Sequence, residues 1–429
     1  METTLDLREV AQQALAQMRA AGFEHAQVTA GRTLQTEVNI AHDQPSLLRS
    51  TESQALALLG IVDQRTASTE LADFTPSAVA ARIAGLVEDA RSAPRDDAYA
   101  VSSGQAASIV QGPQSPDLDV LTGKSAELLA FRARETPHTF LRNAEASHVQ
   151  RQWHTLTSGG SDLAGSVGWY SLSAMGVGRE GDRSSSINYT GGNCHDLVSE
   201  PVDRLFGLGA MLRELPRQVH ARPLGRKFTG DVIFSPQAVG SLLAWLLGQL
   251  GDMQLIAGSS LYRGSVGQRI ASPLLTLRSR FDAPGVAAVT ADAFAAPPVT
   301  LVDAGTLRAL TPSLYGSRKT GIAHVPVAAA GWEVLPGEAP LAELIGSVRE
   351  GAIVNRLSMG MPAANGDFSS VIKNSFLVEG GAVGAALTES MIAGNMAQML
   401  QAIVGVSRER IDTGDLRLPW LRVADLHFS

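Results

Sequence analysis

Apolar residues recur at helical and strand spacings in the first part of the chain. Residues 5–21 carry apolar side chains three and four positions apart, which predicts an amphipathic helix. Alternation of apolar and polar residues over 34–40 and 55–62 predicts strands, and a second amphipathic helix follows Thr75. This order predicts an N-terminal α+β domain over residues 1–92.

The next part of the chain is first polar and then rich in strand patterns. Residues 93–118 are rich in Pro, Ser, Gly, Gln and Asp, a composition typical of a linker. Beyond it we expect a central β-rich domain with helices over residues 119–225. Its expected elements are a helix from Leu121 to before Pro137, strands over 139–157, 165–176 and 184–189, and a helix over 197–215.

The C-terminal region, residues 226–429, opens with the apolar strand 231–234 and a helix over 237–250. Ser235 suits the N-cap of this helix, and its apolar residues lie on nearly every side, so the helix is expected in the core. Further expected elements are a helix over 395–404 and a strand over 420–428. Helices and strands do not alternate as βαβ units, which predicts an α+β fold with antiparallel sheets and flanking helices. A faint twofold pattern of strands followed by helices suggests an internal duplication.

Residues 176–181 match the glycine pattern GxGxxG. A dinucleotide site needs a strand before this pattern and a helix after it. A further strand follows here instead, so we interpret the glycines as a hairpin turn.

Composition excludes several functional classes. The chain of 429 residues has a net charge of −7 and no run of Lys or Arg, which argues against a nucleic-acid partner. No apolar run approaches the length of a membrane span, and the first residues show no export signal. The single cysteine, Cys194, fits a reducing compartment, so we predict a cytoplasmic protein with no membrane partner.

A glycine-rich run, Gly258–Pro273, follows the 237–250 helix. This order of strand, apolar helix and glycine-rich run resembles the TldD/PmbA family, named from a peptidase subunit and a supposed modulator of DNA gyrase. One sort of chain in the family carries an HExxxH helix just before the run and is a zinc peptidase. The other, the TldE/PmbA sort, lacks that motif.

The motif positions in this chain carry no zinc ligands. Counted back without gaps from Gly258, the two histidines would fall on Leu243 and Gly248, and the glutamate on Ala244. The catalytic sort also uses a late cysteine, and the matching stretch 358–369 has none. The resemblance therefore implies no catalytic residue, metal or cofactor in this chain, with zinc expected only in a TldD-like partner.

The most specific match is Asn365–Gly381 followed by 392–395, which resembles a signature of the non-catalytic sort. Turn and strand propensities account for much of it, with Asn395 expected to start a helix. By resemblance, these strands shape the wall of a peptide cleft and a dimer contact. The candidate cleft-lining residues are Ser259, Ser260, Asp367, Ser369, Asn374 and Asn395.

The chain departs from its relatives at one turn. Arg278 and Arg280 stand where many relatives have an acidic Asp-Asp-Pro turn, and Pro284 replaces a usual glutamate. These differences suggest a divergent branch of the family.

The resemblance implies a TldE/PmbA-like subunit that lacks the zinc site and partners a TldD-like metallopeptidase acting on unfolded peptides. Two alternatives stay open: a stand-alone homodimeric peptide-binding module, and a hydrolase of unfamiliar type. The sequence has no GxSxG run, and Cys194 directly precedes His195, an arrangement that seldom lets the two side chains face each other. An independent catalytic activity of the chain is left open.

Overall fold

The first half of the chain forms one large, strongly curved sheet, the N-terminal sheet. The computed structural model describes residues 6–388 and 390–429. The strand order is β3-β2-β1-β5-β6-β4, antiparallel except for β4 with β6, and β7 and β8 also pair with β6. The strands are β1 (His25–Ala41), β2 (Gln44–Val62), β3 (Arg65–Leu71), β4 (Ala106–Gln111), β5 (Thr139–Thr157), β6 (Asp162–Glu180), β7 (Arg183–Ser184) and β8 (Asn188–Cys194).

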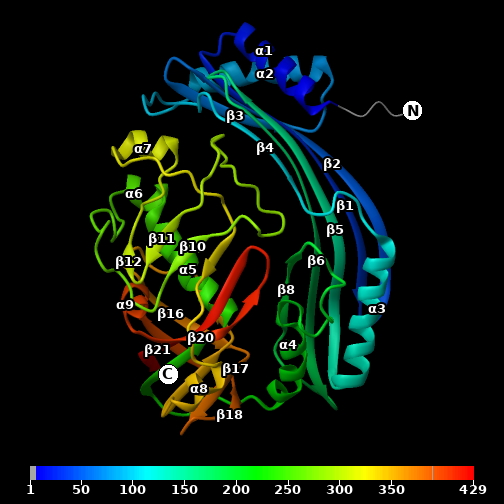
Figure 1. Ribbon diagram of the computed structural model, residues 1–429, viewed down its shortest axis with the longest axis vertical. Coiled ribbons are helices and arrows are strands. Elements are labelled where there is room, and N and C mark those ends of the chain that lie inside the picture. The colour runs from blue at the N-terminus through cyan, green and yellow to red at the C-terminus, as the bar shows by residue number, and fades with distance from the viewer. Residues whose placement is uncertain (1–5, 389) are drawn as a thin grey trace.

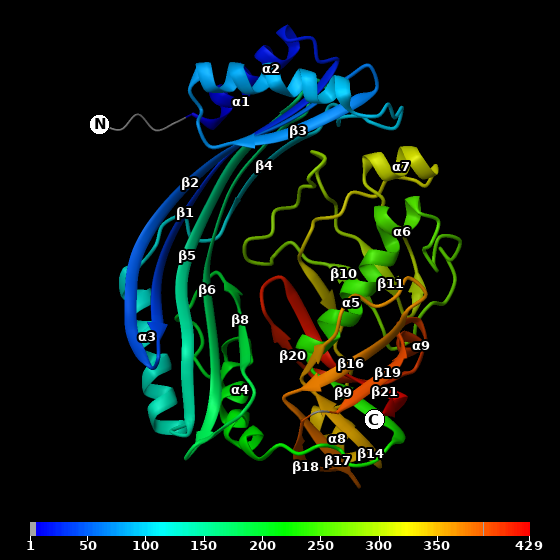
Figure 2. The same ribbon diagram turned by 180° about the vertical axis from the view of Figure 1, so that it is seen from behind.

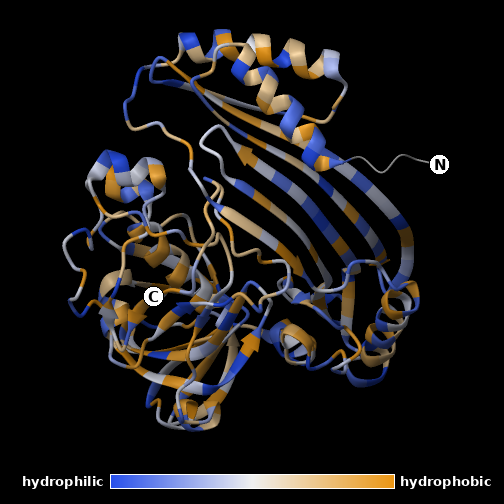
Figure 3. Ribbon diagram, turned by 45° about the horizontal axis from the view of Figure 1, so that its top comes forward, coloured by the Kyte–Doolittle hydropathy of each residue, from blue (hydrophilic) through white to orange (hydrophobic). Residues whose placement is uncertain are grey.

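Helices cover the two ends of this sheet (Figure 1). α1 (Leu7–Ala20) and α2 (Pro76–Ser92) pack at one end, as their amphipathic patterns predict, and α3 (Leu118–Glu135) packs nearer the other. Hydrophilic and hydrophobic residues alternate along the long strands between them (Figure 3). That alternation is expected where only one face of a sheet is buried.

The linker and the domain boundaries predicted in this half stay predictions, and the predicted hairpin is confirmed. The segment 93–118, predicted as a linker, contains β4, which extends the sheet. The sheet also joins strands from residues 1–92 and 119–225, and a division into domains there stays a prediction. The glycines of 176–181 lie in the β6–β7 hairpin, as predicted.

The helix predicted over 197–215 is wrong in length. The chain instead forms η1 (Leu205–Gly207), α4 (Leu208–Glu214) and η2 (Leu215–His220). Phe206 and Gly207 have φ angles of 52° and 76°. Backbone in this left-handed region cannot continue a right-handed helix, so the predicted helix breaks there.

The second half forms the C-terminal sheet, whose main path is β12-β11-β10-β13-β21-β9-β14-β17-β18. β15, β16 and β19 form a further layer that joins β21 through β19, and β20 pairs with β21. Most pairs are antiparallel, the exceptions being β13 with β21 and β14 with β9. The strands are β9 (Phe228–Phe234), β10 (Leu277–Ser279), β11 (Thr300–Asp303), β12 (Thr306–Leu307), β13 (Trp332–Val334), β14 (Glu350–Val354), β15 (Arg356–Ser358), β16 (Asp367–Lys373), β17 (Ser375–Glu379), β18 (Ala382–Leu387), β19 (Met391–Asn395), β20 (Ile403–Asp412) and β21 (Leu416–Phe428).

The helices of this half are α5 (Pro236–Leu250), α6 (Asp252–Ile256), α7 (Leu314–Thr320), α8 (Leu341–Gly346) and α9 (Met396–Gln401). α9 is shorter than the predicted 395–404 because β20 begins at Ile403, and β21 is longer than the predicted 420–428. α5 supplies many residues of the largest apolar cluster, as predicted.

The C-terminal half sits on the concave side of the N-terminal sheet, as the reverse view also shows (Figure 2). The molecule is therefore α+β with two mainly antiparallel sheets, as predicted. The internal duplication stays a prediction. Among the described residues, no helix combines the length and apolarity needed to cross a membrane.

Candidate functional site

Helix α5 begins where its capping residues predict. The Ser235 hydroxyl accepts a hydrogen bond from the Ala238 N–H at 3.4 Å and donates to the Asn355 carbonyl at 2.8 Å. Pro236 occupies the first helical position, where its missing N–H costs nothing. Since Asn355 follows β14, the cap fixes the start of α5 to the sheet.

The three motif positions on α5 do not share one face. Leu243 is only 2% exposed and faces the apolar core. Ala244 and Gly248 are exposed, and a Cβ added at Gly248 would have no heavy atom within 4 Å. The helix therefore has an exposed stripe, and the sequence expectation that it is buried on nearly every side holds only in part.

The second half of α5 ties together two stretches that the sequence singled out. Trp245 donates through its ring N–H to the Ala363 carbonyl at 3.3 Å. Gln249 is 1% exposed; its amide nitrogen donates to the Ala364 carbonyl at 2.9 Å, and its amide oxygen accepts the Leu261 N–H at 2.9 Å. Gln249 thus links the glycine-rich run to the turn before β16.

Asp367 and Asn395 are brought together, as register partners on β16 and β19. The Asn395 amide nitrogen donates to an Asp367 carboxylate oxygen at 2.8 Å. The Asn395 amide oxygen accepts the N–H groups of Ala397 and Gln398, so Asn395 is the N-cap of α9, as predicted. These contacts organise a turn and a helix start, which accounts for both residues structurally.

The other candidate residues lie in different surroundings. Ser259 donates to the side chain of Gln254, and the Ser260 hydroxyl accepts the Tyr262 N–H at 3.1 Å. Ser369 is exposed on β16. Asn374 lies at the other end of that strand, next to Asn355. The six candidates therefore do not form one cluster, and their role in a cleft stays a prediction.

The structure gives no metal-ligand set at these positions. Leu243, Ala244 and Gly248 have no side-chain donor atoms, and Asp367 is already hydrogen-bonded to Asn365 and Asn395. Across residues 6–388 and 390–429, no three His, Cys, Asp or Glu side chains are arranged to hold a metal ion.

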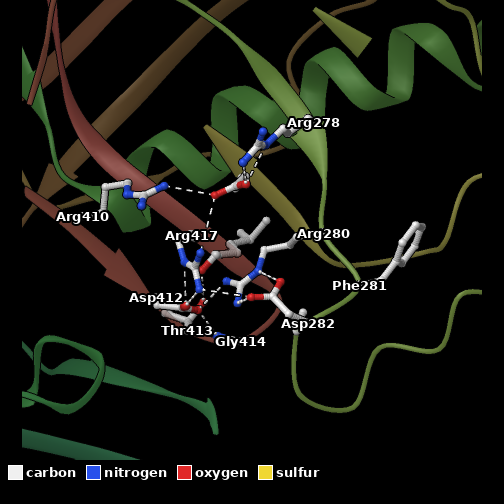
Figure 4. Close-up of polar contacts among 12 residues, drawn as sticks. Arg278, Arg280, Phe281, Asp282, Arg410, Asp412, Thr413, Gly414 and Arg417 are labelled. Carbon is white, nitrogen blue, oxygen red and sulfur yellow. Dashed lines mark hydrogen bonds and ion pairs between the residues drawn. The ribbon is translucent and has the colours of Figure 1, made fainter. Parts of the chain in front are cut away.

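An ionic cluster surrounds the divergent turn (Figure 4). The Glu333 carboxylate, 4% exposed, accepts from Arg278 at 2.7 Å and from Arg410 at 3.0 Å. Arg417 also approaches Glu333, at 3.7 Å. The cluster fastens the β20–β21 hairpin to β10 and β13.

A second part of this cluster centres on Arg280, which contacts both Asp282 and Asp412. Burial raises the pKa of the Asp412 carboxyl, but hydrogen bonds from Arg280, Arg417 and the Gly414 N–H, together with the positive charge of Arg280, outweigh that rise. The pKa of Asp412 therefore lies below its usual value. The sequence singled out Arg278 and Arg280 but not Glu333 or Asp412, which pair with them.

A cleft of about 570 Å³ lies between the concave face of the N-terminal sheet and the loops of the C-terminal half. Thr29, Arg151 and Trp153 line it from the sheet, and residues 285–291 and 328–330 line it from the other side. Most of these loop residues have small side chains. No sequence pattern marked the sheet residues, because they are ordinary alternating strand positions.

Replacing Gln249 with methionine is expected to lower the free energy of unfolding by about 2 kcal/mol, because the Ala364 carbonyl and the Leu261 N–H both lose the buried amide that links them. Thermal denaturation measures this change. Gln237→Met is the control, since Gln237 is exposed on the same helix, and should change stability by less than about 0.5 kcal/mol. Equal melting of the two variants would contradict the linking role of Gln249.

Comparisons with known proteins identify relatives of this chain. Residues 227–429 match the PmbA/TldA metallopeptidase C-terminal domain. The chain is 23% identical to the metalloprotease PmbA of Escherichia coli O157:H7, across 93% of this chain and 92% of that protein.

Solved structures resemble the whole fold. The crystal structure of TldE from Thermococcus kodakarensis superposes with a TM-score of 0.82 and 18% identity, over 98% of this chain and all of that one. A proposed modulator of DNA gyrase from Bacteroides thetaiotaomicron gives a TM-score of 0.84 and 19% identity, over 98% of each chain. At these identities the structural likeness establishes the fold.

Proposed function

Because the chain belongs to the PmbA/TldD family, we propose that it is a TldE/PmbA-like subunit that binds no zinc and partners a TldD-like metallopeptidase. The main support for this proposal comes from helix α5. Its cap, its position in the core and its links to the glycine-rich run are all present, yet Leu243, Ala244 and Gly248 supply no ligand atom. A catalytic zinc needs three protein ligands and an open position for water.

The proposed role of the subunit is to build part of the space in which an unfolded peptide lies. The cleft on the concave sheet supports this role, since small side chains face it from the loops and a polar sheet surface faces it from the other side. Polar side chains on this face of the sheet, such as Thr29 and Arg151, would bind main-chain groups of a peptide, and such contacts do not depend on a particular sequence. The bond cleavage itself is assigned to the partner.

We expect the purified chain to contain no stoichiometric zinc and to capture a histidine-bearing TldD-like subunit when the two are co-expressed. Elemental analysis after purification without chelator measures the first, and co-purification the second. Chelator-sensitive cleavage of an unstructured peptide should require the partner. One zinc per chain that survives dialysis, or a partner that cleaves equally well alone and never co-purifies, would overturn the proposal.

A stand-alone homodimeric peptide-binding module is the second candidate, because one chain forms the cleft by itself and peptide binding there would need no TldD-like partner. Light scattering and peptide titration on the isolated chain separate it from the first. A stable homodimer that binds peptide and takes up no TldD-like subunit would support this second function instead.

A further inference from the structure

A second pocket, of about 450 Å³, lies between the two halves of the chain. Phe206 and Met211 line it from the segment around α4. Ile345, Phe376 and Trp420 line it from the C-terminal half. The walls are therefore largely apolar, as in sites that bury most of a small ligand.

One carboxylate, that of Glu214, enters this apolar pocket. The Asn355 amide nitrogen donates to its Oε2 atom at 2.9 Å. Within the described part of the chain, the other carboxylate oxygen has no hydrogen-bond or ion-pair partner. Burial raises the pKa of Glu214, while the Asn355 hydrogen bond and the charge of Arg217 oppose that rise. A carboxylate held this way needs a donor more than a carboxylate in water does.

The residues behind Glu214 are strained and incompletely hydrogen-bonded. Asn355 also donates to the Asn374 carbonyl at 2.8 Å, so its amide nitrogen is hydrogen-bonded to both Glu214 and Asn374. Asn374 has a φ angle of 52° and is 3% exposed, and both polar atoms of its side chain lack a partner among the described residues. Strain and unpaired polar groups of this kind concentrate at functional sites.

The nearby cation does not neutralise Glu214 by direct contact. The Arg217 guanidinium lies over the ring of Phe376, 4.4 Å from its centre, and forms no ion pair with Glu214 in the described structure. One oxygen of the carboxylate thus stays available to a ligand that enters from the pocket.

We propose that this pocket binds an apolar molecule that carries a protonated primary amine. The ammonium group would donate to the free oxygen of Glu214, and the apolar group would fill the space between Phe206 and Trp420. An anion would be repelled by the carboxylate, and a neutral apolar molecule would leave it without a donor. The amine can come from the free amino terminus of a peptide that begins with a large apolar residue, or from a small free amine. This inference does not depend on the metallopeptidase assignment.

Calorimetric titration of the full chain with three probes tests the proposal. The probes are phenethylamine, a tripeptide amide that begins with phenylalanine, and the same tripeptide N-acetylated. We expect at least one of the two amines to bind, and the acetylated peptide to bind at least about tenfold more weakly than its free form where that form binds. Binding of the free peptide identifies an amino terminus as the source, and binding of phenethylamine alone identifies a small amine. The proposal would be overturned if the free and the acetylated peptide both bound with equal affinity, or if neither phenethylamine nor the free peptide bound.

Two variants locate the binding. Glu214→Gln keeps the shape of the side chain and removes its charge, so amine affinity should fall at least about tenfold. Glu200→Gln is the matched control at an exposed carboxylate near Arg204, and should bind the amine unchanged. Ala210→Trp places a large ring at an exposed position on the pocket wall and should also abolish binding, even if Glu214→Gln fails to fold. Unchanged affinity in a folded Glu214→Gln variant, or in Ala210→Trp, would refute the site.

Discussion

A chain carrying Leu243→His, Ala244→Glu and Gly248→His is expected to cleave no peptide and to lose about 4 kcal/mol of unfolding free energy. Most of the loss comes from Leu243, because an imidazole there replaces a buried apolar side chain and finds no polar partner in the core. The new histidines would also point to different sides of α5, one into the core and one outward. Even on one face they would supply two ligands, short of the three that a catalytic zinc requires.

The double variant Ala244→Glu, Gly248→His separates stability from chemistry. Both positions are exposed, so the double variant should fold with nearly unchanged stability and still show no activity. Chemical denaturation measures the stabilities, and cleavage of an unstructured peptide with and without chelator measures activity. Chelator-sensitive turnover by either variant alone would show that a third ligand exists and that the proposed division of labour is wrong.

Replacing Glu333 with alanine is expected to lower the free energy of unfolding by about 3 kcal/mol. The substitution leaves Arg278, Arg410 and Arg417 close together with no shared carboxylate. This decrease in unfolding free energy is at the lower end of the range for a broken buried ion pair, because the three arginines remain partly in contact with water. The β20–β21 hairpin should loosen first, since the cluster fastens it to β10 and β13.

Thermal melting and amide hydrogen exchange over β20 measure this effect. Arg278→Ala is the matched control: the Arg278 side chain is about half exposed, and Glu333 keeps two other arginines, so the loss should stay below about 1 kcal/mol. If Glu333→Ala melted like Arg278→Ala, the cluster would contribute little to holding the hairpin.

Local signals in the sequence predicted local structure well. Ser235 and Pro236 mark the start of α5 because a cap involves only a few neighbouring residues. The N-cap role of Asn395 was predictable for the same reason. The helix over 197–215 was predicted wrongly because Phe206 adopts a positive φ, which no propensity of an aromatic residue foretells.

The sequence pattern did not predict contacts between residues far apart in the chain. Glu333 is 55 residues from Arg278, and Asn355 is 141 residues from Glu214. The spacing of residues predicts contacts within one helix or strand, whereas these pairs form only when separate elements pack together. The sequence motifs indicated the family, whereas the exposed stripe on α5 and the pocket at Glu214 could be recognised only in the structure.

The position of β9 has a consequence for the chain during its synthesis. β9 lies between β21 and β14, and its contact Arg422–Asp231 spans 191 residues of sequence. At ribosomal speed, roughly 10–40 s pass between the emergence of those two ends. During that interval Val232, Ile233 and Phe234, all fully buried in the folded protein, have no β21 to cover them. Newly made chains therefore expose these apolar residues for that time, and a translational pause before β21 should increase the aggregated fraction.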